Sequence, residues 1–282
     1  MIHFVKEKLS ALSYRLELIS ECNRLIKSGK NLPKNYKKLI FREPYRYNDF
    51  IQFLCFINNN NTINLIDIGT NEGKFIKDFL LFFPKCNSIN CFEPLSYLND
   101  KIKENLKIKP DLRYQIINKA LSNKTGKQKI YYDKNNTELA SLNTYNVNYN
   151  ESFPSLINNE YKASSEEIVE IDLLDNFCKD FSLNNEFIVK IDSQGNELEV
   201  IQGGIETLRR SSVVLLECSF VPQYTDKEHT FSECAAILKN LDLHPIIFQQ
   251  YGKIISSYGV ERDVIFVKKE LLSKVYYKNY IT

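Results

Sequence analysis

The sequence predicts an α/β protein built on one largely parallel sheet that closes with an antiparallel hairpin. From residue 61 onward, short apolar runs of strand length alternate with amphipathic stretches of helical length. This alternation is typical of a parallel sheet with helices on both faces. The last two apolar runs are joined through a turn around Gly252 with no helical stretch between them, which indicates the hairpin. The 282 residues suffice for one such domain and an extension.

The first 60 residues are predicted to form a helical extension. Apolar residues recur there in steps of three and four, with one polar member: Ile2, Val5, Leu9, Leu12, Leu16, Ile19, Asn23 and Ile26. Ser28-Gly29-Lys30 is expected to end this helix, and a second helical stretch is expected from Tyr47 to Ile57. The apolar stripe either packs onto the main domain or pairs with another subunit in a homo-oligomer. So short a seam is marginal as an isolated coiled coil, which favours packing within the chain.

Seven strands and four helical stretches are expected after the extension. The strands are Ile63–Ile68, Ser88–Phe92, Tyr114–Ile117, Phe187–Ile191, Val213–Glu217, Pro245–Phe248 and Asp263–Val267. The helical stretches are Lys74–Phe83, Ser96–Leu106, Asn196–Leu208 and Ser232–Leu241. Residues 133–165 break the rhythm, because they are rich in Asn, Ser, Tyr and Glu without a clear period. We interpret them as a variable loop that contacts the substrate.

Composition excludes several classes of protein. Lys and Arg number 37 against 35 Asp and Glu, a balance that argues against a nucleic-acid partner. No apolar run approaches the roughly 18 residues that span a bilayer, and the N-terminus lacks a signal-peptide core. The seven cysteines are odd in number and include no CxxC pair, which favours reduced, buried thiols. These features together predict a cytoplasmic protein.

The segment from Asp67 to Gly73 is predicted to be the turn between a buried strand and a helix. Its two glycines, Gly69 and Gly73, are expected to let the backbone approach a ligand closely. Glu93 follows twenty residues after Gly73, at the end of the next strand. An acidic residue at that place accepts hydrogen bonds from the ribose hydroxyls of an adenosine-containing ligand.

The identity of that ligand depends on Asp67, two residues before the first glycine. A carboxylate there would repel a pyrophosphate, but it suits the ammonium group of a methionine moiety. The third glycine expected of an NAD site is also missing, since Gly69-x-x-x-Gly73 is the whole pattern. The turn therefore favours S-adenosylmethionine over NAD.

Four separated sequence blocks resemble those of FkbM-type methyltransferases in order and rough spacing. They are DIGTNEG, CFEP, INKALS, and finally IVKIDSQGNELEVIQGG followed by VVLLECS, and the resemblance covers about 200 residues, from Asn64 to Val267. It leaves out the first 60 residues. The resemblance implies a class I, Rossmann-like methyltransferase fold with a seven-stranded sheet. It also implies O-methylation from S-adenosylmethionine, usually of a sugar hydroxyl or of a glycosylated or polyketide-type product.

The resemblance also assigns the residues of the cofactor site. Asp67, Gly69, Asn71 and Gly73 match the first motif, and Thr70 stands where alanine is common. Glu93 and Pro94 match the second motif, while Asn118 and Ala120 fall where the third strand ends beside the adenine. Gln194 stands where the family often has Glu, so we assign it no catalytic role.

Two acids are predicted at the reactive end of the site. Asp192 and Glu217 follow at the carboxyl ends of adjacent strands, where open α/β sheets place ligands. Asp192 is the first choice for the base or for the group that orients the acceptor hydroxyl, and Glu217 is the second. A divalent cation between them is an alternative that two carboxylates without a third ligand support weakly, and we assign no metal ligands. His229, in the loop of residues 221–230, is an alternative base.

The sequence therefore predicts a methyltransferase domain over residues 61–282 behind a helical extension over residues 1–60. The expected reaction is methylation of a hydroxyl of a sugar or glycoconjugate, in surface-polysaccharide synthesis. One rival is a non-catalytic module that binds a nucleotide or a partner on the same fold. Another is an NAD(P)-dependent sugar-nucleotide enzyme, but its Tyr-xxx-Lys pair is matched only by Tyr97 and Lys101, too early in the chain for that role.

Overall fold

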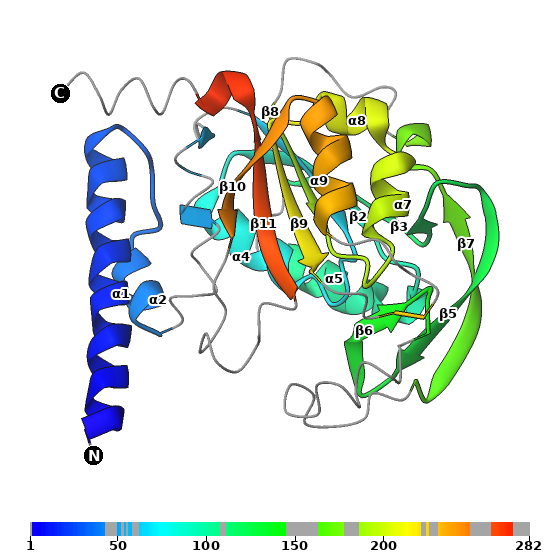
Figure 1. Ribbon diagram of the computed structural model, residues 1–282, viewed down its shortest axis with the longest axis horizontal. Helices are drawn as coiled ribbons and strands as arrows, with labels where there is room; N and C mark the ends of the chain where they lie inside the picture. The colour runs from blue at the N-terminus through cyan, green and yellow to red at the C-terminus, as the bar shows by residue number, and fades with distance from the viewer. Residues whose placement is uncertain are drawn as a thin grey trace.

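A seven-stranded sheet with the order β10-β11-β9-β8-β1-β2-β3 forms the centre of the molecule (Figure 1). The computed structural model describes residues 2–42, 50–51, 54, 56–57, 62–107, 111–144, 163–177, 186–220, 224–225, 231–248 and 261–272. The strands are β1 (Ile63–Ile68), β2 (Cys86–Phe92), β3 (Arg113–Ile117), β8 (Glu186–Ile191), β9 (Val213–Ser219), β10 (Leu243–Phe248) and β11 (Glu261–Lys268). Only β11 runs antiparallel to its neighbours, β9 and β10. The predicted parallel sheet with a terminal hairpin is confirmed.

Helices cover both faces of this sheet. Helices α4 (Lys74–Phe82) and α5 (Asn99–Leu106) lie on one face, and α7 (Glu197–Gln202), α8 (Ile205–Arg209) and α9 (Phe231–Asn240) lie on the other (Figure 1). Short 3₁₀ turns, η1 (Ser96–Leu98) and η2 (Leu174–Asn176), complete these connections. Successive strand residues point to opposite faces, so Leu65 packs with α4 while Ile66 packs with α7. Both faces of the central strands β1, β8 and β9 are buried, which explains why these strands read as continuous apolar runs, whereas the edge strand β3 is mostly exposed.

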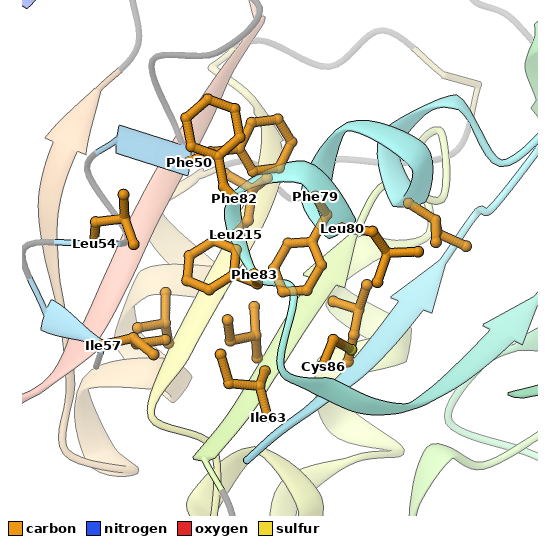
Figure 2. Close-up of a cluster of buried hydrophobic side chains, with 14 of the residues drawn as sticks. Phe50, Leu54, Ile57, Ile63, Phe79, Leu80, Phe82, Phe83, Cys86 and Leu215 are labelled. Atoms are coloured by element: carbon orange, nitrogen blue, oxygen red, sulfur yellow. The ribbon is translucent and has the colours of Figure 1, made fainter. Parts of the chain in front are cut away.

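Figure 2 shows how the segment before β1 is fixed to the main domain. The side chains of Phe50, Leu54 and Ile57 point into the same cluster as Phe82 and Phe83 of the α4 region. The Phe50 ring stacks on that of Phe82 with their centroids 5.4 Å apart. The extension therefore shares its core with the domain that follows it.

The N-terminal helices α1 (Ile2–Lys27) and α2 (Tyr36–Arg42) stand at one end of the molecule (Figure 1). Helix α1 ends where Ser28-Gly29-Lys30 predicts, and residues 50, 51, 54 and 56 of the expected second stretch are helical. From Leu12 to Lys27, where the side chains of α1 are described, the buried ones are Leu18, Cys22 and Leu25. The expectation that the heptad stripe packs within the chain is wrong for Leu12, Leu16 and Ile26, which are 43, 53 and 44% exposed. No helix within the described ranges is long and apolar enough to cross a membrane.

A second, four-stranded sheet was not predicted. Its order is β4-β7-β5-β6, with β4 (Ala120–Leu121), β5 (Gly126–Asp133), β6 (Asn136–Ser141) and β7 (Ser165–Asp172). The interpretation of residues 133–165 as a loop is therefore wrong for 136–141, which form a strand because they pair with β5. Residues 145–162 of that segment lie outside the described residues.

Five of the seven cysteines lie in the described ranges, and all five are free and buried: Cys22, Cys86, Cys91, Cys218 and Cys234. Burial raises the pKa of the Cys22 thiol to about 12. Such thiols stay protonated and pack as small apolar groups. Cys55 and Cys178 lie outside the described residues.

Candidate active site

A cavity of about 370 Å³ opens at the carboxyl ends of β1, β2, β8 and β9. The chain continues from β1 to β2 on one side and returns to β8 on the other, so this is the point where the strand order reverses. Open α/β sheets bind ligands at that point. Residues 137–140 of β6 form part of the wall, so the second sheet helps to enclose a volume typical of small-molecule sites.

The turn after β1 is glycine-dependent because protein atoms occupy the space that a side chain would need. Gly69 has a φ of 76° and Gly73 a φ of 79°, in the left-handed region. A Cβ on Gly69 would lie 1.7 Å from the carbonyl oxygen of Asp192, and one on Gly73 would lie 3.3 Å from Ile102 Cα. We expected these glycines to let the backbone approach a ligand. In the structure they let it approach the end of β8 at Gly69 and helix α5 at Gly73. Gly69 lines the cavity, whereas Gly73 lies at the start of α4 outside the cavity wall.

Thr70 and Asn71 both line the cavity, as the sequence predicts for cofactor residues. The Thr70 hydroxyl donates to the backbone oxygen of Asp67 at 2.9 Å, which closes the turn. Asn71 Oδ1 accepts a hydrogen bond from the hydroxyl of Thr137 at 2.7 Å. Asn71 therefore connects the turn to β6 of the second sheet.

Glu93, directly after β2, is a buried carboxylate fixed by two backbone donors. The backbone N–H of Asn71 donates to Oε2 at 2.8 Å, and the backbone N–H of Leu95 donates to Oε1 at 2.9 Å. Burial raises the pKa of Glu93 to about 7, against the lowering effect of these two hydrogen bonds. Each carboxylate oxygen keeps a second lone pair, so Glu93 fits two ribose hydroxyls in the cavity that it lines beside Pro94.

Asp67 does not line the cavity. Its side chain is fully buried, and neither carboxylate oxygen accepts a hydrogen bond within the described residues. Oδ1 lies 3.9 Å from the ammonium of Lys190, which does line the cavity. Burial raises the pKa of Asp67, while Lys190 lowers it. Asp67 therefore lies behind the cavity wall, against Lys190, and its contact with a methionine ammonium stays a prediction.

The two residues predicted beside the adenine separate in the structure. Ala120 lines the cavity, but Asn118 is exposed and lies outside the wall. The side-chain Nδ2 of Asn118 donates to the backbone oxygen of Glu93 at 2.9 Å. The side chains of Asn118 and Asn99 also donate a hydrogen bond to each other. Asn118 therefore supports the position of Glu93. Lys119, which lies between them and was not predicted, does line the cavity.

The predicted pair of acids, Asp192 and Glu217, is brought together by Gln194. Its Nε2 donates to Asp192 Oδ1 at 3.0 Å and also to Glu217 Oε2. Its Oε1 accepts from the Tyr224 hydroxyl at 2.9 Å. Because carboxylates only accept hydrogen bonds, the amide has to be oriented this way. On the other side of Asp192, the ammonium of Lys190 lies 2.8 Å from Oδ2.

These contacts determine the charge of Asp192. Burial alone would raise its pKa, but Lys190 and the surrounding hydrogen bonds outweigh burial and hold the pKa below its usual value. Asp192 and Asp67 in turn hold the pKa of Lys190 above its usual range, against burial, and the ammonium lies 5.4 Å from the centre of the Phe75 ring. The cavity therefore presents Asp192 as a carboxylate that accepts hydrogen bonds.

Sequence reasoning missed Lys190 as a site residue, and it set Gln194 aside. The position of Lys190 carried a usable signal: it lies two residues before Asp192, so both point to the same side of the chain. His229 lies outside the described residues. Among the residues described, no three of His, Cys, Asp and Glu are close enough to share a metal ion. Lys101 of the Tyr97–Lys101 pair is bound to Glu72.

Comparison with known proteins identifies the family. The sequence profile of the family described as Methyltransferase FkbM domain matches residues 67–253. The 2-O-methyltransferase NoeI of Sinorhizobium fredii (strain NBRC 101917 / NGR234) is 26% identical over 212 residues, which are 73% of this chain and 80% of that protein.

Solved structures to which this chain is similar include the small RNA methyltransferase HEN1 and a precorrin-6y C5,15-methyltransferase from Geobacter metallireducens GS-15. HEN1 is 10% identical with a TM-score of 0.41, over 81% of this chain and 26% of that one. The precorrin enzyme is 11% identical with a TM-score of 0.36, over 74% of this chain and 82% of that one. Since the family profile spans more than half of the sequence, the chain belongs to the FkbM methyltransferase family and is an S-adenosylmethionine-dependent methyltransferase.

Proposed function

We propose that this enzyme transfers a methyl group to a hydroxyl oxygen of a sugar or glycoconjugate, in the synthesis of a surface polysaccharide. The observation that carries the proposal is the carboxylate of Asp192, held in the cavity wall between the ammonium of Lys190 at 2.8 Å and the side-chain amide of Gln194 at 3.0 Å. Such a group suits a hydroxyl that must be oriented and must lose its proton. The 2-O-methyltransferase activity in the name of the Sinorhizobium relative supports oxygen as the accepting atom.

The cofactor half of the cavity is assigned to the turn after β1 and to the end of β2. Glu93 would accept hydrogen bonds from the ribose hydroxyls, and Gly69, Thr70, Asn71, Pro94 and Ala120 would border the nucleoside and the amino-acid moiety. Asp67, Gly73 and Asn118 would hold these residues in place from behind the wall. When bound, S-adenosylmethionine supplies an electrophilic methyl group on a sulfonium, which an oxygen nucleophile displaces in line.

The acids would serve the acceptor. Asp192 accepts a hydrogen bond from the acceptor hydroxyl and so directs an oxygen lone pair toward the methyl group. As the new C–O bond forms, that oxygen becomes positive and its proton becomes acidic enough for a carboxylate of low pKa to take. Lys190 keeps Asp192 anionic until that moment, and Glu217 offers a second acceptor beside it.

The test is an Asp192→Asn substitution, measured by transfer of labelled methyl from S-adenosylmethionine to glycans. We expect turnover to fall by about 100-fold or more, because the amide cannot take the proton. Binding of S-adenosylhomocysteine should be retained. Glu217→Gln should cost less than Asp192→Asn. Unchanged turnover in Asp192→Asn contradicts the assignment. If turnover instead falls by about 100-fold in His229→Asn, the base is His229.

We also propose that residues 61–282 are the catalytic domain and that the extension over residues 1–60 joins two copies of the chain. The support is the apolar stripe of α1, of which Leu12, Leu16 and Ile26 are exposed. A stripe of this kind is favourable to bury against a second copy.

A further inference from the structure

We propose that the acceptor is a neutral or ammonium-bearing glycoside, with no carboxylate, sulfate or phosphate near the hydroxyl that is methylated. This inference rests on the proposed function and names the class of sugar that the same cavity accepts. Its basis is the charge of the cavity wall and the way in which the positive charges in that wall are already used.

Acids outnumber bases in the described part of the cavity wall. Apart from Glu93, which the proposed function gives to the cofactor, the carboxylates are Glu72, Glu138, Asp192 and Glu217, and the bases are Lys74, Lys119 and Lys190. No arginine lies in that part of the wall. Arginine is the residue that usually recognises carboxylates and phosphates through paired hydrogen bonds. The wall therefore lacks, over its described residues, the group that an anionic sugar would most favour.

Each of the three lysines already has a carboxylate partner. Lys190 Nζ lies 2.8 Å from Asp192, and Lys119 Nζ lies 2.8 Å from Asp172. Lys74 Nζ lies 3.1 Å from Glu138. An anionic acceptor would therefore have to share an ammonium whose charge is already neutralised by at least one carboxylate.

The acids offer the opposite interaction. Carboxylate oxygens accept hydrogen bonds from hydroxyl or ammonium donors, which a neutral or amino sugar provides in number. An anionic substituent beside the reacting hydroxyl would face the ionised Asp192, in a cavity where water screens charge less than in bulk. Repulsion of this kind disfavours anionic sugars without requiring any additional contact to a neutral or amino sugar.

The experiment measures transfer of labelled methyl from S-adenosylmethionine to a panel of glycosides matched except for charge. The panel contains neutral hexosides, amino-sugar glycosides, uronic acids, and sulfated and phosphorylated sugars. We expect label on neutral or amino members and at least about tenfold less on their anionic counterparts. Equal or stronger labelling of the anionic members overturns the inference while leaving sugar methylation intact. If no glycoside is labelled while S-adenosylhomocysteine binds normally, the sugar assignment itself is overturned, and this inference falls with it.

A matched pair of variants tests the cause. Glu138→Gln removes one negative charge from the wall and leaves Lys74 with less neutralisation, so labelling of anionic relative to neutral sugars should rise by about threefold. Glu166→Gln is the control, because Glu166 also pairs with a lysine, Lys129 at 2.8 Å, but neither residue lies in the wall. Its ratio should stay at the wild-type value. An unchanged ratio in Glu138→Gln, or an equal rise in Glu166→Gln, overturns the electrostatic explanation.

Discussion

Gly69 illustrates at the scale of one residue how the fold and the site depend on each other. It ends β1 in a left-handed conformation and touches the carbonyl of Asp192 at the end of β8. We predict that Gly69→Ala lowers the free energy of unfolding by about 3 kcal/mol or more, because the added Cβ is both strained and overlapped. Denaturant unfolding monitored by circular dichroism measures this loss.

Gly29→Ala is the control for that measurement. Gly29 has a similar φ of 88°, but nothing lies within 4 Å of the position of its Cβ. The Gly29→Ala substitution should lower the free energy of unfolding by about 1 kcal/mol, because only the strain of the left-handed conformation is added. Equal losses in the two variants would show that the contact with Asp192 carries no energy.

Single acidic residues of the site could be predicted from their place at strand ends. Glu93, Asp192 and Glu217 were expected at the carboxyl edge, and the structure places all three in the cavity wall. Hydrogen-bond partners between neighbouring strands could not be predicted in the same way. Gln194 joins Asp192 to Glu217 across β8 and β9 from a left-handed conformation with φ of 50°, and no sequence pattern reveals such a geometry.

At the scale of elements, the central strands β1, β8 and β9 were predictable because both of their faces are buried. The edge strand β3 is mostly exposed and was predicted from the short run Tyr114–Ile117. The second sheet was not, because β5 and β7 are partly exposed and contain many Lys and Glu residues, so that they read as polar connections. Strand β5 pairs with β7 across more than thirty residues of intervening sequence, which a local pattern does not show.

Helix α1 carries the prediction at this scale. If its exposed stripe joins two copies of the chain, Leu12→Glu combined with Leu16→Glu should halve the mass measured by light scattering, since two buried charges would oppose association. Ser13→Glu combined with Arg24→Gln lowers the charge by the same two units at exposed positions farther from the centre of the stripe and should leave the mass unchanged. A wild-type mass equal to one chain contradicts the proposal.

At the scale of the whole molecule, the proposed cofactor site is assembled from parts distant in sequence. The turn after β1 supplies Asn71, whose amide fixes Glu93 after β2 and whose side chain bonds Thr137 of the second sheet. Strand–helix alternation predicted a parallel sheet, and the acids at the strand ends predicted a site at its carboxyl edge, although the order of the strands was not predicted. The contribution of β6 could not be predicted, since it depends on the packing of one sheet against the other.

Glu93 gives this assembly a pH dependence. Its pKa of about 7, raised by burial, means that the protein without ligand holds a proton there below pH 7. Ribose hydroxyls donate to the ionised carboxylate, so binding expels that proton. Affinity should therefore rise with pH, by up to about tenfold between pH 6 and pH 8.

The most direct test of the account is calorimetric titration of S-adenosylhomocysteine into the wild type, Glu93→Ala and Asp100→Ala. Asp100, whose side chain is 95% exposed on α5, is the control acid and should bind as the wild type does. We predict measurable binding by the wild type that strengthens from pH 6 to pH 8. Glu93→Ala should bind about 100-fold more weakly and without that pH dependence, since two hydrogen bonds to a charged group are lost. No binding by the wild type, or an equal affinity in Glu93→Ala, would contradict the assignment of this cavity as a cofactor site with Glu93 on the ribose.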